Sequence, residues 1–426
     1  MTKQAKDTAG TAYVAEVAKL IHGGQGLGSL EDGRKALLWN VLPGERVEFI
    51  PKKSKSSYVE GVATEIIEVS PDRVQPRDEL YLSTSPWQIV AEEKEDLLKQ
   101  AILEETFARG GFGNLEIGFK RTSQFWEYRN KMEYSFYGDD EGLHLAMFNR
   151  GTHRKQVVHG SSIAMPMLDE VARQLVSILN GASIRGTSLK SVILRANQKG
   201  EVVVALFVKD EDFPKLNDLG SISRGLIVVY SNPKSPASVR TRDLYTFGNI
   251  DLSDTLAGQE ISYDVFSFFQ VNCAVFEESL DKIKAFCGFD KVVDFYSGVG
   301  TIGVTTPGIT KLVESDPNNI IHARKNVAQL QVNVDVIEAH GEKALEHIPS
   351  TGCLIVDPPR AGLHGSVVEQ ILESKPSKIV YLSCNPSTQV RDLALLQKSY
   401  EVVSVEGFNF FPRTPHIESL LCLRRR

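Results

Sequence analysis

Hydrophobic and polar residues alternate in two different ways along this chain. In the first 70 residues the apolar positions form short runs between glycine-rich or lysine-rich turns, and these runs predict strands over residues 13–20, 35–41, 46–50 and 60–69. Closely spaced short strands are typical of a small β-barrel. The glycine run at 23–28 resembles a phosphate-binding loop, but neither a helical pattern nor Gly-Lys-Ser follows it. We therefore interpret it as a barrel turn.

The middle of the chain begins with a linker, predicted at residues 71–76. A helix is predicted at 92–110, with one face formed by Leu97, Leu98, Ala101, Ile102 and Thr106. Residues 127–263 then contain mainly strands and turns, with one helix at 167–179.

After Phe266 the pattern changes to a regular alternation of strands and helices. Helices are predicted at 275–286 and 317–330, and strands at 291–295, 311–314, 334–338, 354–356, 379–382, 401–405 and 420–423. Such alternation predicts an α/β fold with a doubly wound, mostly parallel, Rossmann-like sheet covered by helices on both faces. We expect three domains: a barrel at 8–70, a central β-rich α+β domain at 71–262 and a third domain at 263–426. The helix at 92–110 is expected to pack on the third.

Composition limits the classes of function. The chain has 426 residues, 42% of them hydrophobic, and a formal net charge of −6, so a simple polyanion-binding module is disfavoured. RNA remains a possible substrate because local basic clusters occur, for example at Arg129 and Lys131. No run of about 18 apolar residues is present, and residues 1–10 are polar. We expect a cytoplasmic protein with no membrane contact.

Five cysteines occur, all from residue 273 onward, and none has the close spacing of a metal-ligand set. We therefore predict no metal site. Cys287 falls in a helical pattern, while Cys353 and Cys422 fall in apolar strands, so all three are expected in the core. Cys384 differs because it follows a strand.

Two strand ends carry the most informative residues. Asp357 and Cys384 directly follow the apolar runs 354–356 and 379–382. The carboxyl ends of parallel strands open onto the ligand crevice, so both side chains are expected at one pocket. A carboxylate beside a thiol there suggests covalent chemistry next to a bound cofactor.

A glycine turn, 296–301, follows the first strand of the third domain. It has Gly-x-Gly without the third glycine of the dinucleotide fingerprint, and an acidic residue, Asp294, precedes it. Glu314 ends the next strand, where a carboxylate can accept hydrogen bonds from both ribose hydroxyls. The combination favours S-adenosylmethionine over a nicotinamide cofactor.

Several motifs in one order resemble those of the RNA (uracil-5-)methyltransferase family, which makes 5-methyluridine in tRNA and ribosomal RNA. They are the glycine turn, Ser267-Phe268-Phe269-Gln270-Val271-Asn272, Asp357-Pro358-Pro359-Arg360-Ala361-Gly362-Leu363, Ser383-Cys384-Asn385-Pro386 and the segment from Phe411-Pro412 to Glu418. Looser similarity extends to residues 128–133 and to the barrel, which resembles a TRAM domain, an RNA-binding module with an oligonucleotide-binding fold.

The resemblance implies roles for individual residues. Those at the cofactor would be Gln270, Tyr296, Gly298, Thr301, Glu314 and Asp357. Many relatives carry asparagine at the position of Thr301. His340 falls where relatives often place a polar residue near adenine, although a surface histidine is the favoured interpretation.

Uracil carbon 5 is too weak a nucleophile to take a methyl group unaided, so the chemistry needs a thiolate at carbon 6 and a base for the carbon 5 proton. Cys384 is the candidate nucleophile, and we expect its site to favour the thiolate. Glu418 is the candidate base, favoured by the resemblance over His416. The target base must leave its stack to reach the cysteine. Phe268, Phe269 and Phe411 are candidate stacking surfaces, or ordinary core.

The chain also departs from the family. Many relatives bind an iron–sulfur cluster through four cysteines, whereas the equivalent segment here, residues 82–88, has none. We expect no cluster.

We predict a monomeric, S-adenosylmethionine-dependent enzyme that methylates carbon 5 of a uridine in structured RNA. Ribosomal RNA is favoured over the tRNA T-loop, because the shorter tRNA-specific relatives usually lack the barrel. The alternatives are a cytosine-5 RNA methyltransferase, disfavoured by Asp357-Pro358-Pro359 where a Pro-Cys pair would be expected, and an RNA-binding protein with a vestigial methyltransferase fold.

Overall fold

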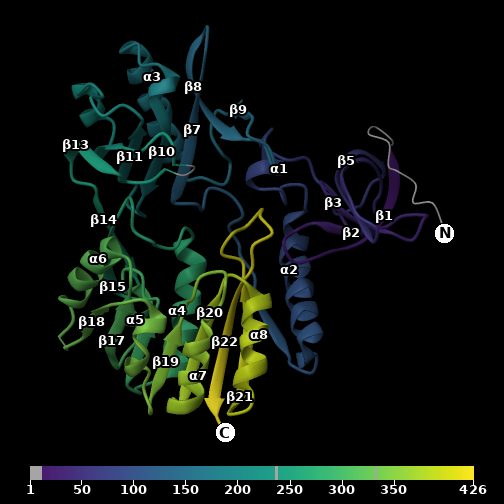
Figure 1. Ribbon diagram of the computed structural model, residues 1–426, viewed down its shortest axis with the longest axis vertical. Coiled ribbons are helices and arrows are strands. Elements are labelled where there is room, and N and C mark those ends of the chain that lie inside the picture. Colours follow the sequence, from purple (N-terminus) through teal and green to yellow (C-terminus); the bar gives the residue numbers. More distant parts are fainter. Residues whose placement is uncertain (1–11, 236–237, 332) are drawn as a thin grey trace.

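The computed structural model describes residues 12–235, 238–331 and 333–426. Residues 8–11 of the predicted barrel lie outside this part. A small barrel, a central sheet with one long covering helix, and a large α/β sheet follow one another along the chain, with the barrel at the right of Figure 1 and the α/β sheet at the bottom. Among the described residues, no helix has the length and apolar character needed to cross a membrane.

Five strands close the barrel in the order β1-β2-β3-β5-β4. Their bounds are β1 Tyr13–Leu20, β2 Gly26–Ser29, β3 Lys35–Trp39, β4 Arg46–Ser54 and β5 Tyr58–Glu68. The interpretation of 23–28 as a turn was wrong in its second half, because Gly26 and Gly28 belong to β2. A β-carbon on Gly26 would lie 2.3 Å from Val41 Cγ2, and one on Gly28 would lie 2.7 Å from the Glu16 carbonyl oxygen. Glycine there permits the close approach of a narrow barrel.

A connecting segment contains α1 (Tyr81–Thr84) and leads to α2 (Glu92–Phe107), which continues as the π-helical turn η1 (Ala108–Phe112). The predicted face of this helix was only partly right: Ile102 is buried, but Leu97 is 43% exposed, and Glu95 and Lys99 are fully buried. The apolar pattern failed because α2 buries charged groups that find partners far away in the sequence. The helix packs against α8 (Pro386–Leu396), β6 (Ile117–Lys120) and β21 (Tyr400–Phe408) of the third part.

The central part is a seven-stranded sheet in the order β13-β12-β11-β10-β7-β8-β9, covered by α3 (Pro166–Gly181). The bounds are β7 Lys131–Asp139, β8 Gly142–Phe148, β9 Lys155–Val157, β10 Leu189–Ala196, β11 Val202–Val208, β12 Gly225–Tyr230 and β13 Arg242–Gly248. A hairpin, β14 (Asp251–Leu256) and β15 (Gln259–Asp264), then leads to the third part.

The third part is built on an eight-stranded sheet in the order β18-β17-β16-β19-β20-β22-β21-β6. Its strands are β6 Ile117–Lys120, β16 Val292–Phe295, β17 Ile309–Glu314, β18 Asp335–Glu338, β19 Cys353–Val356, β20 Lys378–Ser383, β21 Tyr400–Phe408 and β22 Glu418–Arg425. Only β22 runs antiparallel to its neighbours. The edge strand β6 was missed by the sequence analysis, since it comes from residues far before this domain.

Helices cover both faces of this sheet. Alternate strand residues enter two separate cores, one formed with α4 (Cys273–Cys287), α5 (Thr301–Thr305) and α6 (Pro317–Val327), the other with α2, α7 (Gly365–Ser374) and α8 (Pro386–Leu396). This arrangement confirms the predicted doubly wound fold. Cys287, Cys353 and Cys422 are buried in the first core, as predicted.

Candidate active site

Strand pairing brings Cys384 and Glu418 together. In the antiparallel pair β20–β22, Ser383 lies opposite Ser419. The residues one step further, Cys384 and Glu418, therefore face each other at the end of the ladder. Asp357 follows β19, the parallel neighbour of β20 on the other side. The two motifs that follow apolar runs thus meet at one edge of the sheet, together with a third from the C-terminal segment.

The charges at this edge strongly perturb one another. Burial, and then the charges of Glu418 and Asp357, raise the pKa of Cys384 to about 11, while Arg360 opposes the shift. Burial raises the pKa of Asp357 to about 7. Burial and the charge of Asp357 also raise the pKa of Glu418 well above its ordinary value. Burial, the largest cause, and the two acidic neighbours thus disfavour the expected thiolate, which stays a prediction.

His416, the competing candidate base, is a weak one. Burial, followed by the positive charges of Arg360, Lys99 and Arg129, lowers its pKa to about 4. Its ring lies edge-on to Phe411, with 5.7 Å between the ring centroids. The low basicity leaves Glu418 as the stronger proton acceptor.

A pocket adjoins the same edge. Gln270, Tyr296, Gly298, Thr301 and Asp357, which the resemblance placed at a cofactor, all line it. Glu314 is not among its lining residues. The Glu314 side chain instead accepts hydrogen bonds from the amides of Gly298 (2.7 Å), Ser315 (2.8 Å) and Asp316 (2.7 Å). It therefore fixes the glycine turn to the end of β17, and one lone pair of its four remains for a ligand.

The glycine turn has an unusual backbone. Tyr296, Gly298 and Gly300 have positive φ angles of 64°, 57° and 87°. Such a conformation is uncommon for tyrosine and suggests a functional constraint. The Tyr296 ring packs on Gly341, where a β-carbon would lie 2.6 Å from the tyrosine hydroxyl oxygen. The neighbouring His340 is exposed, in agreement with the favoured interpretation.

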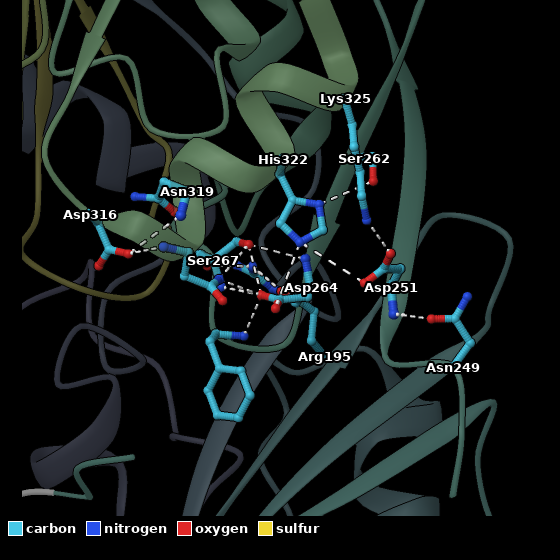
Figure 2. A network of polar contacts seen from close by, with 12 residues as sticks. Arg195, Asn249, Asp251, Ser262, Asp264, Ser267, Asp316, Asn319, His322 and Lys325 are labelled. Atoms are coloured by element: carbon cyan, nitrogen blue, oxygen red, sulfur yellow. Dashed lines mark hydrogen bonds and ion pairs between the residues drawn. The ribbon is translucent and has the colours of Figure 1, made fainter. Parts of the chain in front are cut away.

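A polar network holds the segment that carries Gln270 (Figure 2). Asp264 Oδ1 accepts hydrogen bonds from the Ser267 amide (2.7 Å) and hydroxyl (2.7 Å). Asn319 of α6 accepts one from the Phe268 amide at 2.9 Å. His322 points toward Asp264, with 3.7 Å between Nε2 and Oδ2. Burial alone would raise the pKa of Asp264, but hydrogen bonds from its partners outweigh burial and lower it.

Arg195 of β10 completes this network from the central sheet. Its guanidinium is buried and donates hydrogen bonds to the carbonyls of Ser267 (2.7 Å) and Phe269 (2.8 Å). Sequence reasoning missed Arg195, because no local signal connects a strand of the central domain with the cofactor pocket.

The three candidate stacking residues differ in exposure. Phe268 lines the pocket and is 59% exposed. Phe269 is buried and stacks on Tyr263 at 4.0 Å between ring centroids, so it belongs to the core. Phe411 is partly buried against the core and His416. Of the three, only Phe268 offers an open ring surface.

The loop that carries Glu418 is fixed by buried charges on α2. Asn409 accepts a hydrogen bond from Lys99 Nζ at 2.5 Å and donates one to Asp96 at 2.7 Å. Arg413, which has a positive φ of 62°, donates to Glu95 through its amide (2.9 Å) and its guanidinium (3.0 Å). We name Glu95, Asp96, Lys99, Asn409 and Arg413 the loop-anchoring cluster.

The segment at residues 82–88, where the resemblance would place cluster cysteines, belongs to a hydrogen-bonded group. Gln88 Nε2 donates to Ser85 Oγ (2.6 Å) and Asp78 Oδ2 (2.8 Å), and Asp78 also accepts from the Ser162 amide (3.1 Å). These contacts join three separate stretches of chain. Among the described residues, no group of three or more His, Cys, Asp or Glu could hold a metal ion.

Comparison with known proteins first defines the class. An uncharacterized RNA methyltransferase of Halalkalibacterium halodurans is 29% identical over 443 residues, which cover 96% of this chain and 95% of that protein. An uncharacterized RNA methyltransferase of Enterococcus faecalis is 28% identical over 449 residues, 96% of each chain. Along nearly its whole length the chain is thus similar to RNA methyltransferases, which confirms the predicted class of enzyme.

A family model and a solved structure give more specific similarities than the class of enzyme. The model of the tRNA (uracil-5-)-methyltransferase family matches residues 345–426, so the C-terminal part carries the signature that its motifs predicted. The crystal structure of Pyrococcus abyssi tRNA (uracil-54, C5)-methyltransferase in complex with S-adenosyl-L-homocysteine has a TM-score of 0.79 and 23% identity. The match covers 96% of this chain and 100% of that one. The two proteins therefore share the complete fold.

Proposed function

We propose that the protein transfers a methyl group from S-adenosylmethionine to carbon 5 of a uridine in structured RNA, through a temporary bond between Cys384 and uracil carbon 6. The observation that carries this proposal is the position of Cys384 opposite Glu418, beside a pocket that ends at Asp357. The chemistry needs a thiol and a base on one ring, next to the methyl donor.

The residues of the pocket suit this cofactor. S-adenosylmethionine is positively charged and, when bound, supplies an electrophilic methyl group. Asp357, whose pKa is raised, lines the pocket, and the buried Asp294 Oδ1 has no hydrogen-bond partner among the described residues. Burial, followed by the charges of Asp357 and Glu314, raises the pKa of Asp294 well above its ordinary value. A cation there relieves the repulsion that these groups now experience.

The proposed roles of the chain's residues follow from their charges. Arg360 favours the ionised form of Cys384. The thiol proton passes to solvent before the sulfur adds to carbon 6. The π electrons of the ring then move onto the carbonyl oxygen at carbon 4. They return as carbon 5 takes the methyl group, whose bond to the cofactor's sulfur breaks and leaves S-adenosylhomocysteine. Glu418, as a carboxylate, removes the carbon 5 proton. The double bond re-forms, the carbon–sulfur bond breaks, and Cys384 leaves as a thiolate.

The structural comparison changes the preference between the two candidate RNA partners. Ribosomal RNA was favoured because shorter tRNA-specific relatives lack the barrel. The Pyrococcus abyssi protein, whose name states a tRNA substrate, matches this chain over its full length. The barrel is therefore no ground for preferring ribosomal RNA, and we propose tRNA and ribosomal RNA as equal candidates. We further propose that the barrel, 8–70, binds the RNA as a TRAM-like domain, with the central part at 71–262 and the catalytic part at 263–426.

The first experiment identifies the product. The protein is incubated with methyl-labelled S-adenosylmethionine and with unmethylated tRNA or ribosomal RNA, and the labelled nucleoside is identified after digestion. Label in 5-methyluridine is expected, and the labelled fraction names the substrate. Binding of cofactor and RNA without any label would instead indicate a vestigial fold, and label in 5-methylcytidine would indicate a cytosine-5 enzyme.

Two variants test the covalent route. Cys384→Ala removes the nucleophile and should abolish turnover, whereas Cys273→Ala, at a cysteine outside the pocket lining, should retain it. Glu418→Gln should slow the final elimination and accumulate a protein–RNA adduct that is stable on a denaturing gel. Wild-type methylation by Cys384→Ala, or rapid turnover of Glu418→Gln without an adduct, would contradict the mechanism.

A further inference from the structure

The barrel reaches the active site directly through the turn between β1 and β2. Trp87 Nε1 donates a hydrogen bond to the Gly24 carbonyl at 3.4 Å, and the Trp87 amide donates to the Arg413 carbonyl at 3.0 Å. A β-carbon on Gly24, which has a φ of 94°, would lie 2.3 Å from Pro415 Cβ. The turn is therefore packed against the loop that leads to Glu418.

His22 extends this contact to the strand end that carries the nucleophile. It precedes Gly24 by two residues in the packed turn, and Asn385, the residue after Cys384 and the N-cap of α8, is near enough to raise its pKa. Burial lowers the pKa of His22, whereas Asn385 raises it and the positive charge of Arg360 lowers it. The ring nevertheless retains contact with solvent.

Arg360 is an unpaired cation at the same place. Its backbone carbonyl accepts a hydrogen bond from Asn385 Nδ2 at 2.8 Å. In the part of the chain that the structure describes, no side chain forms an ion pair or hydrogen bond with its guanidinium, which is exposed. Arg360 is close enough to affect the pKa values of His22, Cys384, His416 and Glu418. A free guanidinium at a pocket mouth is suited to bind an anion.

We propose that His22 and Arg360 together bind a phosphate of the RNA strand beside the uridine that enters the pocket, so that the barrel turn forms one wall of the active site. The base and its 5′ phosphate are attached to the same ribose, and a base that reaches Cys384 brings its phosphate to the rim of the pocket. This proposal rests on the proposed function. It assigns to the barrel a direct part in positioning the target nucleotide, in addition to general RNA binding.

A pair of substitutions at His22 tests for the phosphate. His22→Gln retains a hydrogen-bonding side chain without charge, and His22→Lys places a permanent cation there. Binding of an oligouridylate of about 12 nucleotides, within the site size of such barrels, is measured by fluorescence anisotropy at several salt concentrations. If a phosphate lies at His22, the slope of log K against log salt should be steeper by about 0.7 in the lysine variant than in the glutamine variant.

A control excludes a general effect of added charge. Gln397→Lys adds the same charge just beyond the other end of α8, on an exposed side chain, and should leave the wild-type slope unchanged. Equal slopes for the two His22 variants, or an equal increase for Gln397→Lys, would overturn the proposal. Calorimetry with S-adenosylmethionine checks that each variant remains folded.

Turnover gives a second readout that separates this proposal from the proposed function. With an RNA that the protein methylates, His22→Gln should raise KM for RNA about tenfold while kcat stays within about twofold. The reason is that the side chain binds the strand and not the reacting atoms. If the wild-type protein forms no 5-methyluridine but the slopes differ as expected, the phosphate contact stands and the proposed function fails. If the wild-type protein methylates uridine and the slopes are equal, only the phosphate contact fails.

Discussion

The two halves of the candidate active site are fixed by different kinds of contact. The cofactor pocket depends mainly on neighbours in its own part of the chain: Asp264 holds Ser267 three residues later, and Asn319 holds Phe268 from the adjacent helix. The loop that leads to Glu418, called the catalytic loop below, depends on α2. Its Arg413 donates a hydrogen bond to Glu95 of that helix, 318 residues away in the sequence. The pocket segment thus has support from nearby residues in addition to Arg195 of β10, whereas the contacts that hold the catalytic loop come from a distant helix. Variants can therefore separate cofactor binding from catalysis.

The largest effect is expected from Glu95→Gln in the loop-anchoring cluster. The substitution leaves Arg413 buried with a weakened partner, which costs about 3–5 kcal/mol in similar cases. The free energy of unfolding, measured with denaturant, should fall by this order, and kcat should fall with it. Glu93→Gln, at an exposed position on the same helix, is the control. Unchanged kcat in Glu95→Gln would show that the catalytic loop does not need α2.

Asp264→Asn should weaken cofactor binding and leave the catalytic loop in place. Hydrogen bonds to a charged group contribute about 1.5–3 kcal/mol, so S-adenosylmethionine affinity should fall by roughly tenfold or more, while the loop-anchoring cluster stays intact. Because the pKa of Asp264 is lowered in the folded state, its contribution to stability is present at neutral pH. That contribution is lost as the pH falls below about 3.9. Titration calorimetry and pH-dependent unfolding measure the two effects, and an unchanged cofactor affinity would argue against the supporting role.

A smaller effect is expected from the titration of Asp357. Its pKa of about 7 means that it is a carboxylate above neutral pH and neutral below it. A positively charged cofactor should therefore bind with constant affinity above pH 7 and up to about tenfold more weakly for each unit below it. Asp357→Asn should remove this dependence, and Glu338→Gln, at an exposed carboxylate, should not. A wild-type affinity that is independent of pH would contradict the assignment of Asp357 to the cofactor.

The smallest effect is expected at Gln88, which belongs to neither the cofactor pocket nor the catalytic loop. Gln88→Ala removes the contacts that join residues 78, 85 and 162, and leaves buried partners unsatisfied at a cost of about 1–3 kcal/mol. Thermal unfolding should show this loss, whereas cofactor affinity should not change. A loss of cofactor binding would show that this segment supports the pocket after all.

Local patterns were sufficient for much of the fold. The strands at 13–20 and 354–356 and the helix at 275–286 were predicted because each is defined by neighbours in sequence. The face of α2 was predicted only in part, since a periodicity of apolar residues carries no information about buried ion pairs. The second half of the glycine run was also predicted wrongly, because only the closed barrel reveals how closely Gly26 approaches Val41.

The same division holds for the candidate site. The positions of Asp357 and Cys384 directly after two strands were sufficient to predict that they lie together, because parallel strands place their carboxyl ends at one edge. The protonation of Cys384 could not be predicted, since the pKa of a thiol depends on which charges and how much protein surround it in space. Arg195 and His22 were missed for the same reason.

The sequence by itself determined the order of strands and helices, the family signature in residues 345–426 and the chemical groups available for the reaction. These properties follow from residue types and short-range periodicity, which act before the chain has folded. Only the tertiary structure decided that α2 holds the catalytic loop, that the barrel turn packs on Pro415 and that burial raises the pKa of Cys384. Each of these depends on electrostatic and packing contacts between residues far apart in sequence, and such contacts exist only in the folded protein.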